Sequence, residues 1–328
     1  MNRALIRGAA IVLALGGALT DSGVSAQAPT YPSKPLRLIT VAPPGSPPDV
    51  VARIISDRLA PALGQPVVVE NRLGGRETIG VAAIARASPD GYTLGVISLP
   101  QAVVPSLLAE MPYDTKRDLA PVAQLVWTPT VLVVRSDSSL RSLPDLIATA
   151  KASPGRLTFA SGGNGTPPHL AGALLMMHGG LDLQHVPYTG AAAGVAAVLG
   201  GQVDMGFPGV AAVTSQLRSG KLRALASTGR VRSAALPDIP TMAELGLTGF
   251  EVVNWVGVVA PAAMPKEIIA RLAGELRKVV AQPEVGDRFA SLGMEPVLDS
   301  NPEAFGALIQ SELAKWARVV REAGIRAD

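Results

Sequence analysis

Two kinds of apolar pattern alternate along the chain. Short runs rich in Val, Leu and Ile predict buried strands at 67–69, 93–98, 130–134, 157–160 and 222–226. Elsewhere apolar residues recur every three or four positions, the spacing of one helix face, at 50–59, 268–280 and 305–320. Strands that alternate with helices are typical of α/β proteins, so the pattern predicts an α/β fold with largely parallel sheets.

The last of these helices also has a start signal. Ser300 and Glu303 have the spacing of a capping box, and Pro302 is tolerated in a first helical turn. The apolar stripe that follows, from Phe305 to Val320, predicts a helix face that packs on the core.

Two loops share one design. Gly45-Ser46-Pro47-Pro48-Asp49 follows the apolar run that starts at Leu36, and Gly165-Thr166-Pro167-Pro168-His169 follows the run that starts at Leu157. Ser46 and Thr166 suit the N-cap, where a side-chain oxygen accepts a backbone N–H, and proline suits the next position, so a helix is predicted to begin at each loop. Helix N-termini carry unpaired N–H groups and the positive end of the helix dipole, so two of them can bind one carboxylate or dicarboxylate. The alternative is two ordinary strand-to-helix turns.

The first residues have the features of a secretory signal peptide. Arg3 and Arg7 precede an apolar run at 9–19, and small residues allow cleavage after Ala26 or Ala28. We therefore expect residues 1–28 to be a signal peptide and the mature protein to be exported. No later stretch approaches the roughly 20 apolar residues that a membrane-spanning helix needs.

Charge and composition narrow the classes of function. The chain has 29 Lys and Arg and 26 Asp and Glu, and loss of the leader leaves 27 basic and 25 acidic residues, a net charge of about +2. This weak charge, without a basic stripe, argues against nucleic acid as a partner. Because the sequence contains no cysteine, disulfides, thiol nucleophiles and Cys-based metal sites are excluded.

Motifs for catalysis are missing from the sequence. It has no G-x-S-x-G elbow, no HExxH and no P-loop, and prolines break the dinucleotide fingerprint that Gly163-x-Gly165 would start. The three histidines, at 169, 178 and 185, do not have the spacing of metal ligands. The sequence therefore predicts no catalytic residue, metal or cofactor, and a hydrolytic enzyme is a less favoured class than a binding protein.

A series of ordered motifs covers Tyr31 to Asp328. They are Tyr-Pro-Ser-Lys-Pro at 31–35, Glu-Asn-Arg at 70–72, Pro-Asp-Gly-Tyr-Thr-Leu at 89–94, the stretches 159–165 and 169–172, Val-Pro-Tyr at 186–188, Gly-Gly-Gln-Val at 200–203, Gly-Lys-Leu-Arg-Ala-Leu-Ala at 220–226 and Leu-Pro-Asp-Ile-Pro-Thr at 236–241. In these motifs the chain resembles the Bug family, also called TctC-like, the periplasmic solute-binding receptors of tripartite tricarboxylate transporters. The resemblance implies a type II periplasmic binding protein fold, with two α/β lobes and a ligand cleft between them. It puts lobe 1 at 29–128 plus 252–328 and lobe 2 at 129–251.

The resemblance also implies a function. A monomer of this kind captures a small mono- or dicarboxylate by flytrap closure and delivers it to the membrane permease subunits of a tripartite tricarboxylate transporter. A second class stays open, in which the closed receptor presents its surface to a membrane sensor kinase, because the same fold and the same closure would serve both.

Family members generally hold carboxylates through backbone amides and ordered water in the loops after the first strands of each lobe. Carried over to this sequence, the ligand-binding residues are Pro44, Gly45, Ser46, Asp49, Ser98, Ser161, Gly162, Gly163, Asn164, Gly165, Thr166, His169, Tyr188, Gly190, Phe207 and Pro208. Three of them have a competing structural interpretation. We favour Asp49 as the acidic half of a capping box and His169 as a partner of local backbone groups, while Tyr188 is equally well a buried core phenol.

The chain departs from the family pattern in four loops, one of them at Thr189, which replaces a lysine of the family and removes a cation near the mouth of the cleft. The family's first loop usually reads Pro-Gly-Gly-x-Thr-Asp, whereas Pro47 and Pro48 here remove two N–H donors and leave those of Gly45, Ser46 and Asp49. Where the family has Phe-Asp-Asn, this chain has Phe-Pro-Gly at 207–209, so an acidic partner for an ammonium group is lost and an amino-acid ligand is disfavoured. The run at 98–101 predicts a more apolar wall of the cleft.

Overall fold

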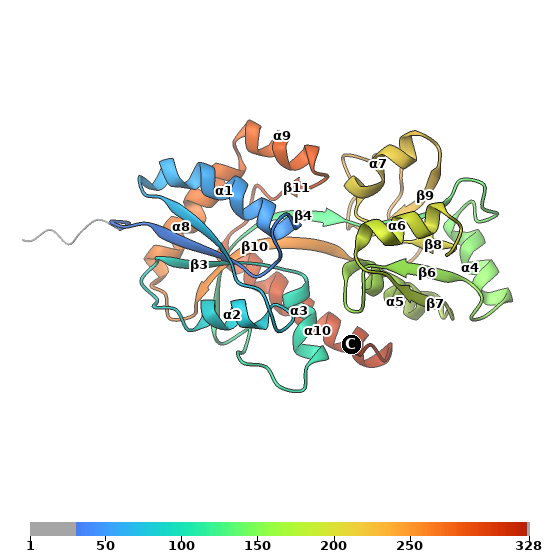
Figure 1. Cartoon of the computed structure of the whole chain (residues 1–328), viewed down its shortest axis with the longest axis horizontal. Coiled ribbons are helices and arrows are strands. Elements are labelled where there is room, and N and C mark those ends of the chain that lie inside the picture. The colour runs from blue at the N-terminus through green and yellow to red at the C-terminus, as the bar shows by residue number, and fades with distance from the viewer. Residues whose placement is uncertain (1–30, 327–328) are drawn as a thin grey trace, which may run out of the picture.

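The computed structural model describes residues 31–326, and the predicted signal peptide at 1–28 lies outside them. Two α/β lobes lie side by side, and long strands run from one into the other (Figure 1). The two-lobe α/β architecture expected from the sequence is therefore confirmed.

Lobe 1 is built on a six-stranded sheet with the order β11-β4-β10-β3-β1-β2. Its strands are β1 (Leu36–Thr40), β2 (Val67–Asn71), β3 (Thr93–Ser98), β4 (Leu119–Pro129), β10 (Val253–Pro261) and β11 (Glu295–Pro296). Its helices are α1 (Pro47–Leu63), α2 (Thr78–Ala85), α3 (Pro100–Leu107), α8 (Lys266–Val280), α9 (Pro283–Ser291) and α10 (Pro302–Glu322).

Lobe 2 is built on a five-stranded sheet with the order β7-β6-β8-β5-β9. Its strands are β5 (Val131–Arg135), β6 (Thr158–Ser161), β7 (Gln184–Pro187), β8 (Met205–Gly206) and β9 (Leu222–Ser227). Its helices are α4 (Leu143–Ala152), α5 (Pro167–Gly179), α6 (Ala191–Leu199) and α7 (Val210–Arg218).

Both sheets are mixed, which corrects the prediction of largely parallel sheets. β1 is parallel to β2 and β3, and β6 is parallel to β7 and β8. By contrast, β10 is antiparallel to β3 and β4, and β5 is antiparallel to β8 and β9. The strands β5 and β10 arrive from the other lobe, so they enter their sheets at the opposite end from the strands that follow a local helix.

Two chain crossings form the hinge between the lobes. The chain passes from β4 to β5 at Thr130 and returns between β9 and β10. Thr228 ties the two crossings together, because its N–H donates to the Thr130 carbonyl at 3.0 Å and its hydroxyl donates to the Val252 carbonyl at 2.6 Å. The predicted lobe boundaries, 128/129 and 251/252, lie at these crossings, and setting domain limits there stays a proposal.

Alternating residues of β1 point into two different apolar cores. Leu36 and Leu38 pack in a cluster with α1 and α8, and Ile39 packs in a second cluster on the opposite face of the sheet. This second cluster continues into lobe 2, where it includes Leu170 and Leu174 of α5. Burying one such leucine contributes about 1.5–3 kcal/mol, and the shared core joins the two lobes on this side.

The start of α10 differs from the predicted capping box. Asn301 is the N-cap, and its side chain accepts the Ala304 N–H at 2.8 Å. Ser300 instead accepts the Gln124 N–H at 2.7 Å, because the helix packs on β4 at this point. The predicted apolar stripe is buried, with Phe305 and Trp316 fully inside. Within residues 31–326, no helix combines the length and apolar character needed to cross a bilayer.

Candidate ligand-binding site

The two glycine loops begin helices with nearly the same backbone. Gly45 and Gly165 have φ angles of 78° and 76°, a left-handed conformation that favours glycine. Ser46 and Thr166 follow as the N-cap residues of α1 and α5, with φ −71° in both and ψ of 160° and 155°. The predicted helix starts at both loops are therefore confirmed.

The two hydroxyls do not cap their helices, which corrects the predicted role of their side chains. Ser46 Oγ donates to the Pro43 carbonyl at 2.6 Å, and Thr166 Oγ1 donates to the Gly163 carbonyl at 2.7 Å. An N-cap oxygen normally accepts the N–H of the second or third helical residue, and the second helical residue is proline in both loops. Each hydroxyl closes its own loop instead.

Asp49 fixes the lobe 1 loop. Its Oδ2 accepts the Gly45 N–H at 2.9 Å and the Arg53 Nε at 3.0 Å, and its Oδ1 accepts Arg53 Nη2 at 3.0 Å and Asn71 Nδ2 at 2.8 Å. The residue is 2% exposed. Desolvation opposes its ionisation, but the hydrogen bonds from Arg53, Gly45 and Asn71 outweigh it and hold the pKa of this carboxyl below its ordinary value.

The Asp49 carboxylate therefore has the structural task that the sequence favoured, with one difference. It binds the N–H of Gly45, one residue before the N-cap, and not the N–H of Ser46 itself, which donates to the Pro43 carbonyl at 3.1 Å. Two N–H groups expected to face an anion, those of Gly45 and Ser46, are thus engaged inside the loop.

His169 occupies the matching position in lobe 2. Its Nδ1 accepts the Gly165 N–H at 3.0 Å, as Asp49 accepts that of Gly45. The ring stacks on His185 of β7, with centroids 3.9 Å apart and an angle of 6° between the planes. His185 Nε2 lies 2.6 Å from Ser161 Oγ, which in turn accepts the Gly163 N–H at 3.1 Å.

The first turns of α5 and α6 line one small cavity, and α6 begins beside Gly162. A Cβ placed on Gly162 would lie 3.3 Å from the carbonyl carbon of Gly190 and 3.4 Å from the Ala191 nitrogen, at the start of α6. A small cavity of about 20 Å³ lies here, lined by Ala160, Ser161, Gly162, Pro168, Ala191, Gly194, Val195, Val198, Gly206, Phe207 and Pro208. This lining contains no charged side chain. The positive ends of α5 and α6 therefore lie beside a cavity that no carboxylate lines.

Phe207 and Pro208 are placed differently within this region. Phe207 is fully buried and makes an edge-to-face contact with Phe159, with ring centroids 6.4 Å apart. Pro208 is buried beside it, and its carbonyl accepts the Val131 N–H at 2.9 Å. Both residues line the lobe 2 cavity.

The remaining predicted residues lie around these loops. Pro44 is exposed at the tip of the lobe 1 loop, and Asn164 is half-buried at that of lobe 2. Gly190 is the N-cap of α6. Tyr188 is half-buried and packs against the apolar core under α6 and α7.

Ser98 belongs to a separate buried group in lobe 1. Its N–H donates to Gln101 Oε1 at 2.6 Å, and Gln101 Nε2 donates to the Glu77 carboxylate. Burial raises the pKa of Glu77, and the hydrogen bond from Gln101 offsets this only in part. Gln101 turns its amide toward the end of β3, and the expected apolar wall of the cleft at 98–101 stays a prediction.

Sequence reasoning missed Arg53, Asn71, Gln101 and His185 as parts of this region. Arg53 has a local signal, since it lies four residues after Asp49 on one helix face. Gln101 similarly lies three residues after Ser98. Asn71 and His185 come from neighbouring strands, and their contacts depend on how the strands pair.

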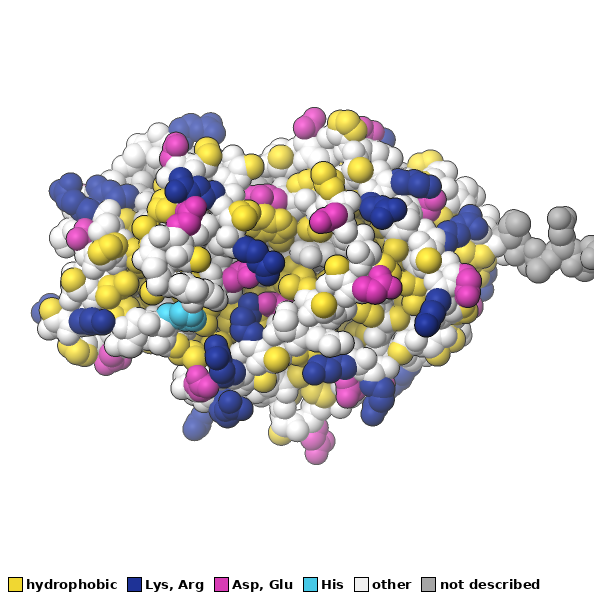
Figure 2. Space-filling model, turned by 180° about the vertical axis from the view of Figure 1, so that it is seen from behind, with side chains coloured by type: hydrophobic (Ala, Val, Ile, Leu, Met, Phe, Trp, Pro, Cys, Tyr) yellow, Lys and Arg dark blue, Asp and Glu magenta, His cyan; other side chains and the backbone are white. Residues whose placement is uncertain are grey.

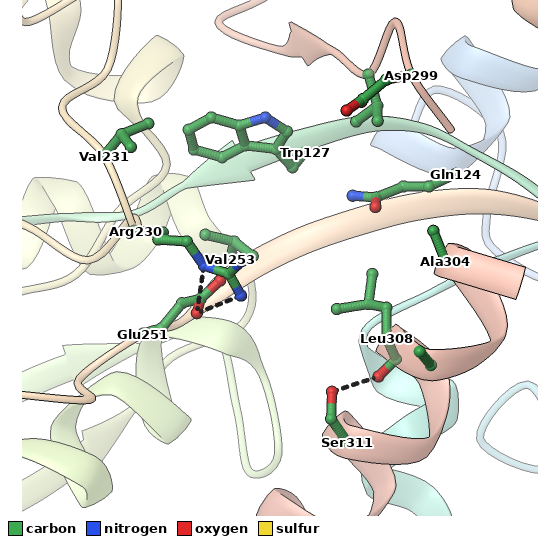
Figure 3. Close-up of a pocket in the computed structure, with 12 residues that line it drawn as sticks. Gln124, Trp127, Arg230, Val231, Glu251, Val253, Asp299, Ala304, Leu308 and Ser311 are labelled. Carbon is green, nitrogen blue, oxygen red and sulfur yellow. Dashed lines mark hydrogen bonds and ion pairs between the residues drawn. The ribbon is translucent and has the colours of Figure 1, made fainter. Parts of the chain in front are cut away.

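A larger cavity, of about 790 Å³, lies at the hinge and contains none of the predicted ligand-binding residues. In Figure 3, Trp127 and Gln124 of β4 lie above it, and Leu308 and Ser311 of α10 lie to one side. Arg230 and Glu251 form an ion pair at its rim, at 3.2 Å. From behind, hydrophobic side chains gather between the lobes while basic and acidic ones are interspersed over the face (Figure 2). Among the described residues that line it, only Ala304 lies in the first turn of a helix, α10.

The comparison with protein families places these loops in context. Residues 39–325 match the TctC family, described as the tripartite tricarboxylate transporter family receptor. The chain belongs to the TctC family. A TctC relative, protein BugT of Bordetella pertussis, is 38% identical over 320 residues, or 96% of this chain and 98% of BugT.

Solved structures agree with this assignment. The periplasmic binding protein BugD is 34% identical, with a TM-score of 0.73 over 91% of this chain and 100% of BugD. MatC from Rhodopseudomonas palustris, with bound malate, is 30% identical, with a TM-score of 0.72 over 88% of this chain and 100% of MatC. The R. palustris protein Rpa4515, with adipate, is 28% identical, with a TM-score of 0.74 over 90% of this chain and 99% of that protein. The TctC family and these neighbours are solute-binding receptors, so the chain is a receptor and not an enzyme.

Proposed function

We propose that this TctC protein captures a small mono- or dicarboxylate between its lobes in the periplasm and delivers it to a tripartite tricarboxylate transporter. The observation that carries the proposal is a small cavity beside Gly162 that is lined by the first turns of both α5 and α6 and by no charged side chain. Helix N-termini attract anions through their unpaired N–H groups and the helix dipole. The malate and adipate held by two structural neighbours belong to the same chemical class.

The predicted ligand-binding residues of both lobes remain part of this proposal. Lobe 2 supplies Ser161, Gly162 and Gly190, and lobe 1 supplies the loop around Gly45. A ligand that touches both loops draws the lobes together, so binding is coupled to closure about the hinge. A decrease in radius of gyration by solution scattering at saturating ligand tests this step, and an unchanged radius at saturation contradicts it.

Calorimetry with malate and adipate, and with their dimethyl esters, tests the ligand class. We expect the acids to bind and each ester to bind more than about tenfold more weakly, a difference of at least about 1.4 kcal/mol, because the ester has no charge for the helix ends to stabilise. Equal affinity of an acid and its ester contradicts the proposal.

Pro208→Asp tests the position of the carboxylate in lobe 2. At an effective dielectric of about 20 and a separation of about 4 Å, one added like charge costs roughly 4 kcal/mol before ions and water relax. We expect malate affinity to fall between about tenfold and about a thousandfold, or roughly 1.4–4 kcal/mol.

Pro208→Asn is the matched control for this variant. It also removes the proline but adds no charge, so its malate affinity is expected to lie much closer to that of the wild type. If both variants fold and bind malate equally well, Pro208 does not face the ligand. Uptake of labelled malate into vesicles that contain the permease subunits, with and without this protein, tests delivery.

A further inference from the structure

A pair of stacked histidines holds the lobe 2 loop. Ligand binding by the loop does not by itself require this stacking. His169 comes from α5 and His185 from β7, and their rings are nearly parallel at 3.9 Å. Phe159 of β6 packs against both, with centroids at 6.4 Å from His169 and 5.0 Å from His185. The pair is therefore a fixed part of the lobe 2 core, directly behind the loop.

Each ring holds one end of the loop. His169 Nδ1 accepts the Gly165 N–H at 3.0 Å, next to the first turn of α5. His185 Nε2 contacts Ser161 Oγ at 2.6 Å, and Ser161 Oγ accepts the Gly163 N–H and donates to the Gly163 carbonyl, each at 3.1 Å. The path of residues 161–165, which turns past the N-terminus of α6, thus depends on both imidazoles.

This arrangement suits uncharged rings. A ring nitrogen accepts a hydrogen bond only when it carries no proton, so protonation of His169 Nδ1 would set two donors against each other at Gly165. Two cationic rings stacked at 3.9 Å would also repel each other. Either change pushes the loop away from its present path.

Within residues 31–326, the helices and strands around the pair carry few charged side chains. The elements β6, β7, β8, α3 and α6 contain no Asp, Glu, Lys or Arg, and α5 contains one further titratable group, His178. Asp204, just before β8, accepts hydrogen bonds from the backbone N–H and the hydroxyl of Thr158 at 2.8 Å each. Helix α10 packs against α5 and carries six charged side chains. Glu312 pairs with Lys315, and Arg321 lies 4.0 Å from Glu322. The other two are Glu303 and Arg318.

We propose that His169 and His185 are positioning residues that hold the lobe 2 loop in its binding conformation while His169 Nδ1 carries no proton and the two stacked rings are not both charged, so that carboxylate binding weakens as the pair is protonated. Imidazoles titrate within the range of about pH 5 to 8, so the effect falls near neutral pH. The inference rests on the proposed function for its binding measurements but not for the state of the loop itself.

Nitrogen NMR of the wild-type protein, labelled with nitrogen-15 at its histidines and glycines and without ligand, tests the loop directly. At about pH 7.5 we expect His169 to have an unprotonated Nδ1 and a protonated Nε2. As the pH falls toward about 5.5, protonation of the pair should coincide with a shift of the Gly163 and Gly165 amide signals. If His169 is protonated at Nδ1 at pH 7.5, or if the glycine signals do not move as the pair titrates, the proposal is overturned whether or not malate binds.

Binding of malate to three variants tests the functional consequence. His169→Asn keeps an uncharged acceptor near Gly165 but cannot titrate, and His185→Gln does the same at Ser161. His178→Gln is the matched control, because His178 lies on the same helix and contacts the Leu174 carbonyl at 3.1 Å instead of the loop. Ionisation of malate affects all proteins alike and cancels when they are compared at each pH.

We expect wild-type and His178→Gln affinities to fall about tenfold or more between about pH 7.5 and about pH 5.5, relative to His169→Asn. His185→Gln should show a reduced pH dependence as well. If the wild type and His169→Asn have the same pH profile, or if wild-type affinity rises at acid pH relative to this variant, the histidines act otherwise and the proposal is wrong. If malate binds none of the proteins, the proposed function fails for this ligand and the NMR measurement decides the inference.

Discussion

The two glycine loops have the same backbone but are held by side chains of different charge. In both, the glycine is left-handed, the next hydroxyl bonds back to a carbonyl three residues earlier, and the glycine N–H is bound by the side chain four residues later. The acceptor is the ionised carboxylate of Asp49 in lobe 1 and the imidazole of His169 in lobe 2. One loop geometry is thus compatible with acceptors of different charge.

The two acceptors differ because the residue one helical turn after each of them is buried in lobe 2 and exposed in lobe 1. Arg53 follows Asp49 by four residues, and its side chain is 53% exposed, so water solvates the guanidinium while it balances the carboxylate. Ala173 occupies the same position after His169 and is 0% exposed, because α5 packs against the core shared by both lobes. An arginine has no space there, and a buried carboxylate without a cation is costly. The surroundings of the residue four positions after the acceptor therefore decide which acceptor a loop can use.

Exchanging the residues that follow the two acceptors by four positions, Arg53 and Ala173, should change the unfolding free energy most. Ala173→Arg places a long charged side chain in a packed core, and we expect a loss of more than about 4 kcal/mol in unfolding free energy, or failure to fold. Arg53→Ala should cost less, because it overpacks no core, although it leaves the buried Asp49 carboxylate without its cation. Urea unfolding of both variants measures the asymmetry. Ala270→Arg, at an exposed position of α8, is the control and should stay within about 0.5 kcal/mol of the wild type. Similar losses for the Ala173 and Ala270 variants would contradict this account.

Removing the lobe 1 acceptor should give the next largest effect. Asp49→Ala leaves the Gly45 N–H and the Asn71 amide without their partner, and we expect a loss of about 2–4 kcal/mol in unfolding free energy. Asp137→Ala is a useful control, because it removes an exposed carboxylate that pairs with Arg135 and should be nearly neutral. If Asp49→Ala is as stable as this control, the carboxylate does not hold the loop.

The sequence predicts the local part of this comparison well. The strand at 93–98 and both helix starts follow from apolar runs and from Ser or Thr before two prolines, and all three are observed. These signals are local because each depends on residues within one turn or one strand. The prediction that the Ser46 and Thr166 hydroxyls cap their helices was wrong. A cap needs N–H partners, and the second proline of each loop removes one of them.

The missed contacts come from pairing between strands. His185 reaches His169 because β7 lies beside β6, with His185 opposite Phe159. Asn71 reaches Asp49 because β2 lies beside β1, with Asn71 opposite Thr40. The long strands β4 and β10 were also missed from pattern alone, since prolines and polar residues interrupt the apolar run at 119–129. Long-range partners of this kind have no signal in the spacing of one segment.

The charge of Asp49 should appear in the pH dependence of stability. Because its pKa is lowered on folding, the carboxylate stabilises the protein fully above its unfolded pKa of about 3.8, and this contribution is lost as the pH falls through that value toward the folded one. Asp49→Asn keeps an acceptor for Gly45 without the charge. We expect the wild type to be more stable by about 1–2 kcal/mol from pH 5 to 8, and the difference to shrink below about pH 4. Urea unfolding at several pH values measures this, and a difference that grows at low pH would contradict it.

Removing the Ser46 or the Thr166 hydroxyl should change the unfolding free energy least, and by equal amounts. Ser46→Ala and Thr166→Val each remove a hydroxyl and little else, and each hydroxyl donates one short bond to a carbonyl of its own loop. We expect a loss of about 0.5–1 kcal/mol for each variant, and values that agree within about 0.5 kcal/mol. A hydroxyl that capped its helix would be worth up to about 2 kcal/mol. Urea unfolding of the pair separates these cases: a loss near 2 kcal/mol at either position would indicate capping in solution, and clearly unequal losses would show that the loops differ in more than their acceptors.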